Sequence, residues 1–170
     1  MAKPSDFLAV ATIVCGTGIG ALIDLRTRRL PNPLTMGLAA IGVAYAACGI
    51  GDLSIGASLA GLALGLALML PGHLIGATGA GDVKLFAAVG AFIGPVHILS
   101  AFLYTALAGG GLAVLISIMR RRLRQTVGST ARLIATAGAN APAIESPLEH
   151  NRFAYAPAIA VGTLLAAMGF

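Results

Sequence analysis

Long apolar runs separated by short polar turns make up most of the chain. Each run is continuously apolar over roughly the length that an α-helix needs to cross a bilayer, whereas a membrane barrel would show segments of about ten residues that alternate between apolar and polar. The pattern therefore predicts an all-α fold, a polytopic membrane helical bundle. We expect about six transmembrane helices, over residues 7–23, 34–50, 55–75, 82–93, 96–119 and 153–170.

Prolines and glycines set the boundaries of these runs. Pro31 and Pro33 follow the first basic turn and cannot continue a helix interior, and Gly94 with Pro95 closes the short fourth run. Small residues also recur at the four-residue spacing that lets membrane helices approach closely. These pairs are Gly16 with Gly20 and Gly61 with Gly65.

The later runs contain two further features, a glycine triplet and a tyrosine. The triplet at 109–111 is Gly-Gly-Gly, which is unfavourable in a helix and indicates either close packing or a flexible point. Tyr155, near the start of the last run, is interpreted as an interfacial aromatic residue.

The first run could also be a cleaved signal peptide. Lys3 is the only base ahead of it and is matched by Asp6, whereas Arg26, Arg28 and Arg29 lie on the far side. We therefore expect this segment to be retained as a helix.

Composition agrees with a membrane protein. The chain is 58% hydrophobic and 10% charged, with a mean hydropathy of +0.92, whereas a soluble domain has roughly 25% charged residues. No polar run is long enough for a separate soluble domain, so we expect one membrane domain over residues 1–170, with a cytoplasmic loop at about 120–152. Cys15 and Cys48 lie inside apolar runs without partners at ligand spacing, so we expect no disulfide frame, no metal and no cofactor.

The net charge of +5 comes from basic clusters beside the apolar runs, without the interleaved aromatics of a nucleic-acid surface. We therefore expect a lipid bilayer and no nucleic acid as partner. The clusters follow the first and fifth runs, and Lys84 lies at the head of the fourth. The positive-inside rule then places both termini outside and puts Asp24 and Asp82 at the same, cytoplasmic, face.

Asp82 is the most unusual residue in this pattern. It follows Gly79-Ala80-Gly81 between apolar runs, and glycines without a Cβ let the backbone bend sharply and let another group come close. A carboxylate near the membrane usually faces a bundle interior or a water-filled cavity. The alternative is a turn residue that caps the next helix.

Two other polar residues are interpreted as structural. His73 lies on the approach to Gly79, where a hydrogen-bonded or interfacial histidine is more common than a ligand. Asp52, in the turn after the second run, is interpreted as a solvated turn residue on the opposite face.

Two aspartates at like depth suit aspartyl hydrolysis, in which a water is held between two carboxyl groups. Like charges a few ångströms apart cannot both ionise readily, so such a pair shares a proton and titrates as a unit. One carboxyl group then acts as base and the other as acid.

These stretches resemble the type IV prepilin peptidases, the Gly-x-Gly-Asp aspartyl proteases of bacterial membranes. The resemblance rests on Asp24 with the basic turn and Leu30-Pro31-Asn32 after it, and on the stretch from Gly79 to Leu85. It covers residues 16–85 by motif and the rest of the chain by hydropathy alone. Two motifs at the ends of the expected helices are far more specific than either alone.

The resemblance implies a membrane aspartic endopeptidase with Asp24 and Asp82 as its catalytic pair. It implies cleavage of the short basic leader from type IV prepilin or pseudopilin precursors, at the cytoplasmic face of the bacterial inner membrane. The mature hydrophobic helix can then enter a pilus or a secretion pseudopilus. The residues expected to shape the site are Gly79, Gly81, Lys84, Pro31 and Asn32.

The chain also departs from the longer members of that family. Those resemble bifunctional enzymes with a cytoplasmic insertion, paired cysteines and an N-methyltransferase activity that uses S-adenosylmethionine. Here the turn after the first run is too short for the insertion and there is no cysteine pair, so methylation is in doubt. The chain is more similar to the compact peptidases of Flp, or tight-adherence, pili, with the archaeal preflagellin peptidases as near neighbours.

Alternatives from other classes use the same aspartates. A proton-coupled transporter would place them at the bilayer midplane on broken helices within an internal repeat, and the sequence shows no repeat. A membrane scaffold subunit would leave the two motifs unexplained. The presenilin-like proteases share Gly-x-Gly-Asp but pair it with Tyr-Asp, whereas Ile23 precedes Asp24.

Overall fold

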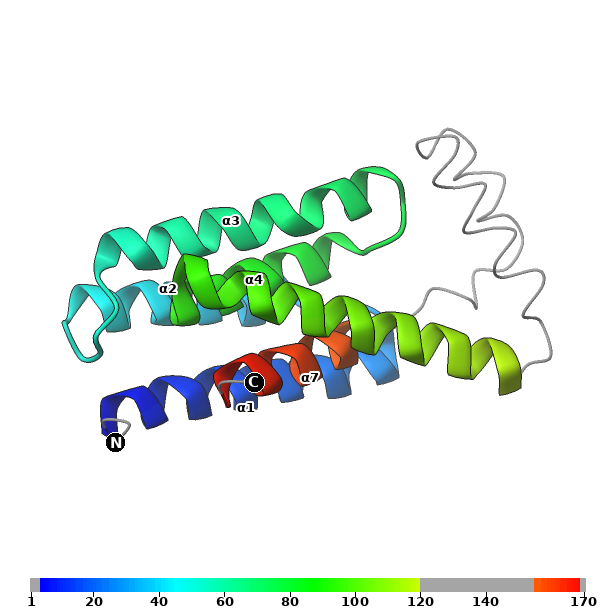
Figure 1. Cartoon of the computed structure of the whole chain (residues 1–170), viewed down its shortest axis with the longest axis horizontal. Helices are drawn as coiled ribbons and strands as arrows, with labels where there is room; N and C mark the ends of the chain where they lie inside the picture. The colour runs from blue at the N-terminus through cyan, green and yellow to red at the C-terminus, as the bar shows by residue number, and fades with distance from the viewer. Residues whose placement is uncertain (1–3, 120–154, 169–170) are drawn as a thin grey trace.

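The computed structural model of the chain describes residues 4–119 and 155–168, and these form helices joined by short turns (Figure 1). The all-helical class is therefore confirmed for the described part of the chain. The predicted loop at 120–152 lies outside the described residues, as does the start of the last predicted run. The helices are α1 (Pro4–Thr27), α2 (Asn32–Ala47), α3 (Ile55–Leu74), α4 (Ala80–Met119) and α7 (Ala156–Ala167).

Three described segments are long and apolar enough to cross a membrane. They are Phe7–Thr27, Ile55–Leu74 and Ala80–Leu115. The helices α2 and α7 are shorter, with 16 and 12 residues, and at 1.5 Å per residue they extend about 24 Å and 18 Å, against about 30 Å for the hydrocarbon core. The prediction of six membrane-length helices is therefore reproduced only in part.

The second run ends earlier than predicted because Gly49 stops α2. Gly49 has a φ of 62°, a left-handed conformation that glycine adopts without strain. Its N–H donates to Ala46 O at 3.2 Å, and the N–H of Ile50 donates to Tyr45 O at 3.2 Å. This pair of bonds is a Schellman motif, which ends the helix although the apolar pattern continues.

The fourth and fifth predicted runs form one element, α4, which is broken at Gly94 (φ 75°, ψ 178°) ahead of Pro95. A Cβ on Gly61 of α3 would meet both Gly90 and Gly94, and one on Gly65 would meet Phe86, Ala87 and Ile98. The chain therefore passes α3 in the opposite direction before the break and in the same direction after it. Figure 1 shows α4 turning back on itself in this way.

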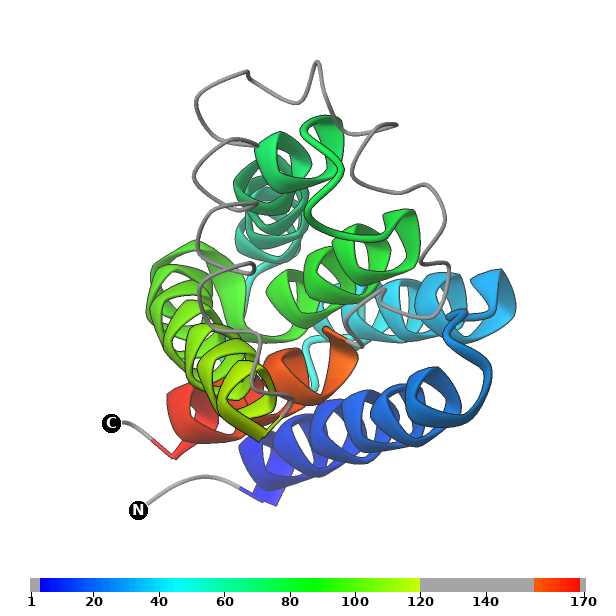
Figure 2. The same ribbon diagram turned by 90° about the vertical axis from the view of Figure 1, so that its right-hand side faces the viewer.

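Small residues let the helices approach closely, as their spacing predicted. Gly61 and Gly90 face each other so tightly that a Cβ on either would meet the backbone of the other. Ser58 Oγ donates to Ala91 O at 2.7 Å in the same interface between α3 and α4. Helix α7 lies between α1 and the second half of α4 (Figure 2).

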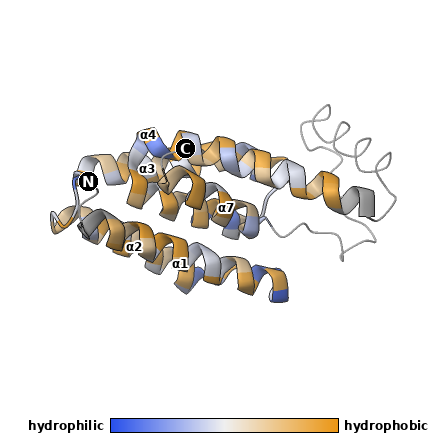
Figure 3. Ribbon diagram, turned by 60° about the horizontal axis from the view of Figure 1, so that its bottom comes forward, coloured by the Kyte–Doolittle hydropathy of each residue, from blue (hydrophilic) through white to orange (hydrophobic). Residues whose placement is uncertain are grey.

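The outside of the bundle is apolar, and its buried polar groups are few. Large exposed hydrophobic side chains occur on every described helix, and Figure 3 shows apolar residues around the helices with hydrophilic ones mostly near the helix ends. This surface suits contact with lipid. The buried charged residues of the described chain are Asp24 and Asp82.

Candidate active site

Asp24 lies near the end of α1, with 7% of its surface exposed. The helix ends just beyond it, where the Arg28 N–H donates to Asp24 O at 2.8 Å and Arg28 turns to a φ of 53°. The Asp24 carboxylate accepts a hydrogen bond at Oδ2 from the Ala156 N–H, at 3.4 Å. The first residue of α7 is therefore a direct partner of Asp24.

Asp82 lies in the first turn of α4 and is also 7% exposed. Its Oδ2 accepts a hydrogen bond from the Gly79 N–H at 3.0 Å, so this oxygen caps the helix. Its Oδ1 is buried with no hydrogen-bond partner. Among the described residues, the hydroxyls of Thr78 and Thr105 are the other buried side-chain atoms without a partner. The helix-cap alternative is thus right for one oxygen and leaves the other unexplained.

The structure brings the two aspartates together at one end of the bundle. The end of α1, which carries Asp24, and the start of α4, which carries Asp82, lie at this end (Figure 1), and Leu30 packs against both Gly20 of α1 and Gly81 of α4. A buried carboxylate without a full set of hydrogen bonds is costly unless it is neutralised or contacts a ligand. Asp82 is such a carboxylate, since its Oδ1 is buried without a hydrogen-bond partner.

Gly79 and Gly81 give the site space, and the close approach of another group that they were predicted to allow is seen at both. The glycine with positive φ in this loop is Gly76, at 77°. A Cβ on Gly81 would lie 2.7 Å from Leu30 Cβ, and one on Gly79 would lie 3.1 Å from Asp82 Oδ2. Because these residues have no side chain, Leu30 can pack on the start of α4, and the Asp82 carboxylate can accept its hydrogen bond from the Gly79 N–H.

The other predicted site-shaping residues join the starts of α2 and α4. Lys84 Nζ donates to Asn32 Oδ1 at 2.9 Å, at an exposed position. Pro31 is the N-cap residue of α2, and its carbonyl oxygen accepts from the N–H groups of Leu34 and Thr35. These contacts lie beside the Leu30–Gly81 contact, so the Leu30-Pro31-Asn32 motif holds the loop after α1 against α4.

His73 braces the loop before Asp82. Its Nδ1 forms a hydrogen bond of 3.0 Å with Thr78 O, and the N–H groups of Ala77 and Thr78 donate to Gly72 O. The interpretation of His73 as a hydrogen-bonded residue is therefore confirmed.

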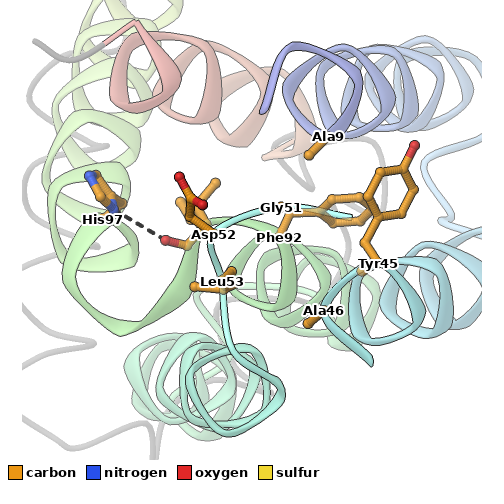
Figure 4. A pocket seen from close by; sticks show the side chains of 10 residues that line it. Ala9, Tyr45, Ala46, Gly51, Asp52, Leu53, Phe92 and His97 are labelled. Carbon is orange, nitrogen blue, oxygen red and sulfur yellow. Dashed lines mark hydrogen bonds between the residues drawn. The ribbon is translucent and has the colours of Figure 1, made fainter. Parts of the chain in front are cut away.

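The described part of the chain has a hollow of 340 Å³ at the other end of the bundle (Figure 4). Asp52 and His97 line one side of it, and the rings of Tyr45 and Phe92 line the other, with centroids 6.0 Å apart. Asp52 is exposed, as predicted for a turn residue. The hollow does not include either buried aspartate.

Sequence reasoning missed the start of α7 as part of the site. Ala156 contributes a backbone N–H, which leaves no mark in a residue pattern, and it lies 132 positions from Asp24. The neighbouring Tyr155 packs its ring against Gly109, where a Cβ would lie 2.7 Å from Cε2. The first glycine of the triplet is therefore a packing position.

No group of three or more histidine, cysteine, aspartate or glutamate side chains in residues 4–119 and 155–168 is placed to hold a metal ion.

Comparison with known proteins identifies one family. Residues 11–114, more than half of the chain, match the type IV leader peptidase family. The match includes both aspartates and all the predicted site-shaping residues, and it ends before α7. Neither the curated proteins nor the solved structures contain a match.

Proposed function

The chain belongs to the type IV leader peptidase family, and on that premise we propose that Asp24 and Asp82 are its catalytic dyad. Membership makes the chain an aspartic membrane peptidase that cleaves prepilin leader peptides. The observation that carries the residue assignment is the pair of buried carboxylates from α1 and α4, of which Asp82 Oδ1 has no partner.

In this proposal the dyad holds one water against the scissile carbonyl of the leader. One carboxylate takes a proton from the water as it attacks the carbonyl carbon, and the other, protonated, gives its proton to the departing nitrogen. The Gly79 and Ala156 N–H groups each hold one oxygen of a carboxylate. The remaining oxygens are then available to the water and the peptide.

The finer assignment is a compact peptidase of the Flp or tight-adherence type. It is supported by the short turn between α1 and α2, residues 28–31, which leaves no room for a cytoplasmic insertion. The precursor would be a small protein with a basic leader and a hydrophobic helix, cut at the cytoplasmic face of the bacterial inner membrane. Methylation of the new N-terminus is not part of the proposal.

A cleavage assay tests this function against its rivals. Purified enzyme in detergent, mixed with such a precursor, is expected to give one product whose mass corresponds to loss of the leader. A transporter would instead move protons across proteoliposomes without cutting the precursor, and a scaffold subunit would do neither. Absence of any cleavage across several precursors of this kind would contradict the proposal.

We propose a six-helix topology with both termini outside, because the basic clusters alternate with uncharged turns along the chain. A reporter that fluoresces only in the cytoplasm is expected to be dark when fused to Phe170 and bright when inserted near Ala141. Fluorescence in cells measures both fusions, with equal protein levels checked by immunoblot. The reverse pattern would contradict the topology and the cytoplasmic placement of the dyad.

A further inference from the structure

The start of α7 contacts two other parts of the bundle at once. The Ala156 N–H donates to Asp24 of α1, and the ring of the preceding residue, Tyr155, lies on Gly109 in the second half of α4. Tyr155 and Ala156 lie beyond residues 11–114, the part of the chain that matches the family. Their position therefore comes from the structure of this chain alone.

We propose that Tyr155 is a positioning residue for the dyad: its ring, seated on Gly109, fixes the start of α7 so that the Ala156 N–H holds the Asp24 carboxylate opposite Asp82. This inference rests on the proposed dyad and adds a third element to it. Asp24 and Asp82 come from separate helices, so their relative position depends on what ties α1 to α4.

The fit between Tyr155 and Gly109 is specific to one face of α4. A Cβ on Gly109 would lie 2.7 Å from Tyr155 Cε2 and 3.0 Å from both Cζ and Oη, whereas Gly110 and Gly111 have nothing within 4 Å. A methyl group at 109 must therefore displace the ring, because such contacts are closer than packed carbon atoms allow. A methyl group at 110 meets open space.

The ring, and not a charge, carries this role. The hydroxyl of a tyrosine side chain has an ordinary pKa of about 10. The side chain therefore stays neutral wherever an aspartyl dyad works, and it adds no third charge to the site. Phenylalanine would keep the ring and its contact with Gly109.

The test compares Gly109→Ala with Gly110→Ala and Tyr155→Ala with Tyr155→Phe, in the full-length enzyme with a prepilin precursor. We expect Gly109→Ala and Tyr155→Ala to lower kcat on the order of 10- to 100-fold with little change in KM, because a displacement of about 1 Å in a catalytic group costs rate more than binding. Gly110→Ala and Tyr155→Phe are expected to match the wild type.

A double variant separates positioning from a general loss of structure. If Gly109→Ala acts only by displacing the ring, it has no further effect in the Tyr155→Ala protein, so the two losses in kcat do not multiply. Independent, multiplying losses would overturn the inference. So would equal losses in the 109 and 110 variants, or a Tyr155→Phe protein as slow as Tyr155→Ala, which would transfer the role to the hydroxyl.

The same assay separates this inference from the proposed function. If asparagine at Asp24 or Asp82 leaves cleavage intact, the dyad itself is wrong. If both asparagine variants are inactive while Tyr155→Ala and Gly109→Ala cleave at the wild-type rate, the dyad stands and only the role of Tyr155 is overturned.

Discussion

Replacing either Asp24 or Asp82 with asparagine is expected to abolish leader removal, with a loss of rate on the order of 10⁴-fold. The change keeps the size of the side chain and removes the group that carries the proton. If the pair shares one proton and holds one water, neither carboxylate can replace the other. The double variant is therefore expected to be no slower than either single variant, because residues that act as a unit are not additive.

The measurement is the ratio of uncut to mature pilin for each purified variant, at equal amounts of folded enzyme. Asp52→Asn is the matched control, since Asp52 is exposed in the turn between α2 and α3, at the other end of the bundle. It is expected to cleave like the wild type. Substantial cleavage by either Asp24→Asn or Asp82→Asn would remove the dyad and return the transporter and scaffold alternatives to consideration.

Gly81→Val is expected to lower cleavage by on the order of 10²-fold while the protein still accumulates in the membrane. The Cβ of any residue at 81 would lie 2.7 Å from Leu30 Cβ, which is not the flexible end of a side chain. The loop after α1 must then move away from α4. This displacement is expected to move Asp24 away from Asp82. Overpacking of this kind costs about 1 to 3 kcal/mol, which leaves most proteins folded.

Gly37→Val is the control for the helix propensity of valine, because Gly37 lies within α2 with nothing within 4 Å of its Cβ position. Cleavage rates and membrane levels of both variants are compared with those of the wild type. Full activity in the Gly81→Val protein would show that the close approach of Leu30 to α4 is not needed by the site. Loss of both variants from the membrane would point to folding instead.

The helices could be predicted from the sequence because their signals are local. Apolar runs placed α1 and α3, and Gly94 with Pro95 marked the break in α4. The end of α2 was missed, because the Schellman motif at Gly49 depends on one left-handed residue inside a continuing apolar run. Hydropathy depends on side chains, whereas this helix end is formed by backbone hydrogen bonds, so a hydropathy pattern cannot reveal it.

The site was predictable where side chains carry it. Asp24, Asp82, Lys84 and Asn32 were all named from motifs. The structure places the two aspartates at the end of α1 and the start of α4 and joins Lys84 to Asn32 by a hydrogen bond. The close approach that Gly81 allows was predicted, but only the packed structure shows that Leu30 is the residue that approaches it. Ala156 could not be predicted at all, because it acts through a backbone N–H that any residue except proline supplies.

The hydrogen bond from Ala156 to Asp24 also sets an order in the making of the enzyme. The two residues are 132 positions apart, and at roughly 5 to 20 residues per second a ribosome needs roughly 7 to 26 s to travel between them. During that time the nascent chain can already hold both aspartates in the membrane, yet it lacks the donor that fixes one of them. If Asp24 needs this donor, as proposed, the peptidase is expected to become active only when α7 has been inserted.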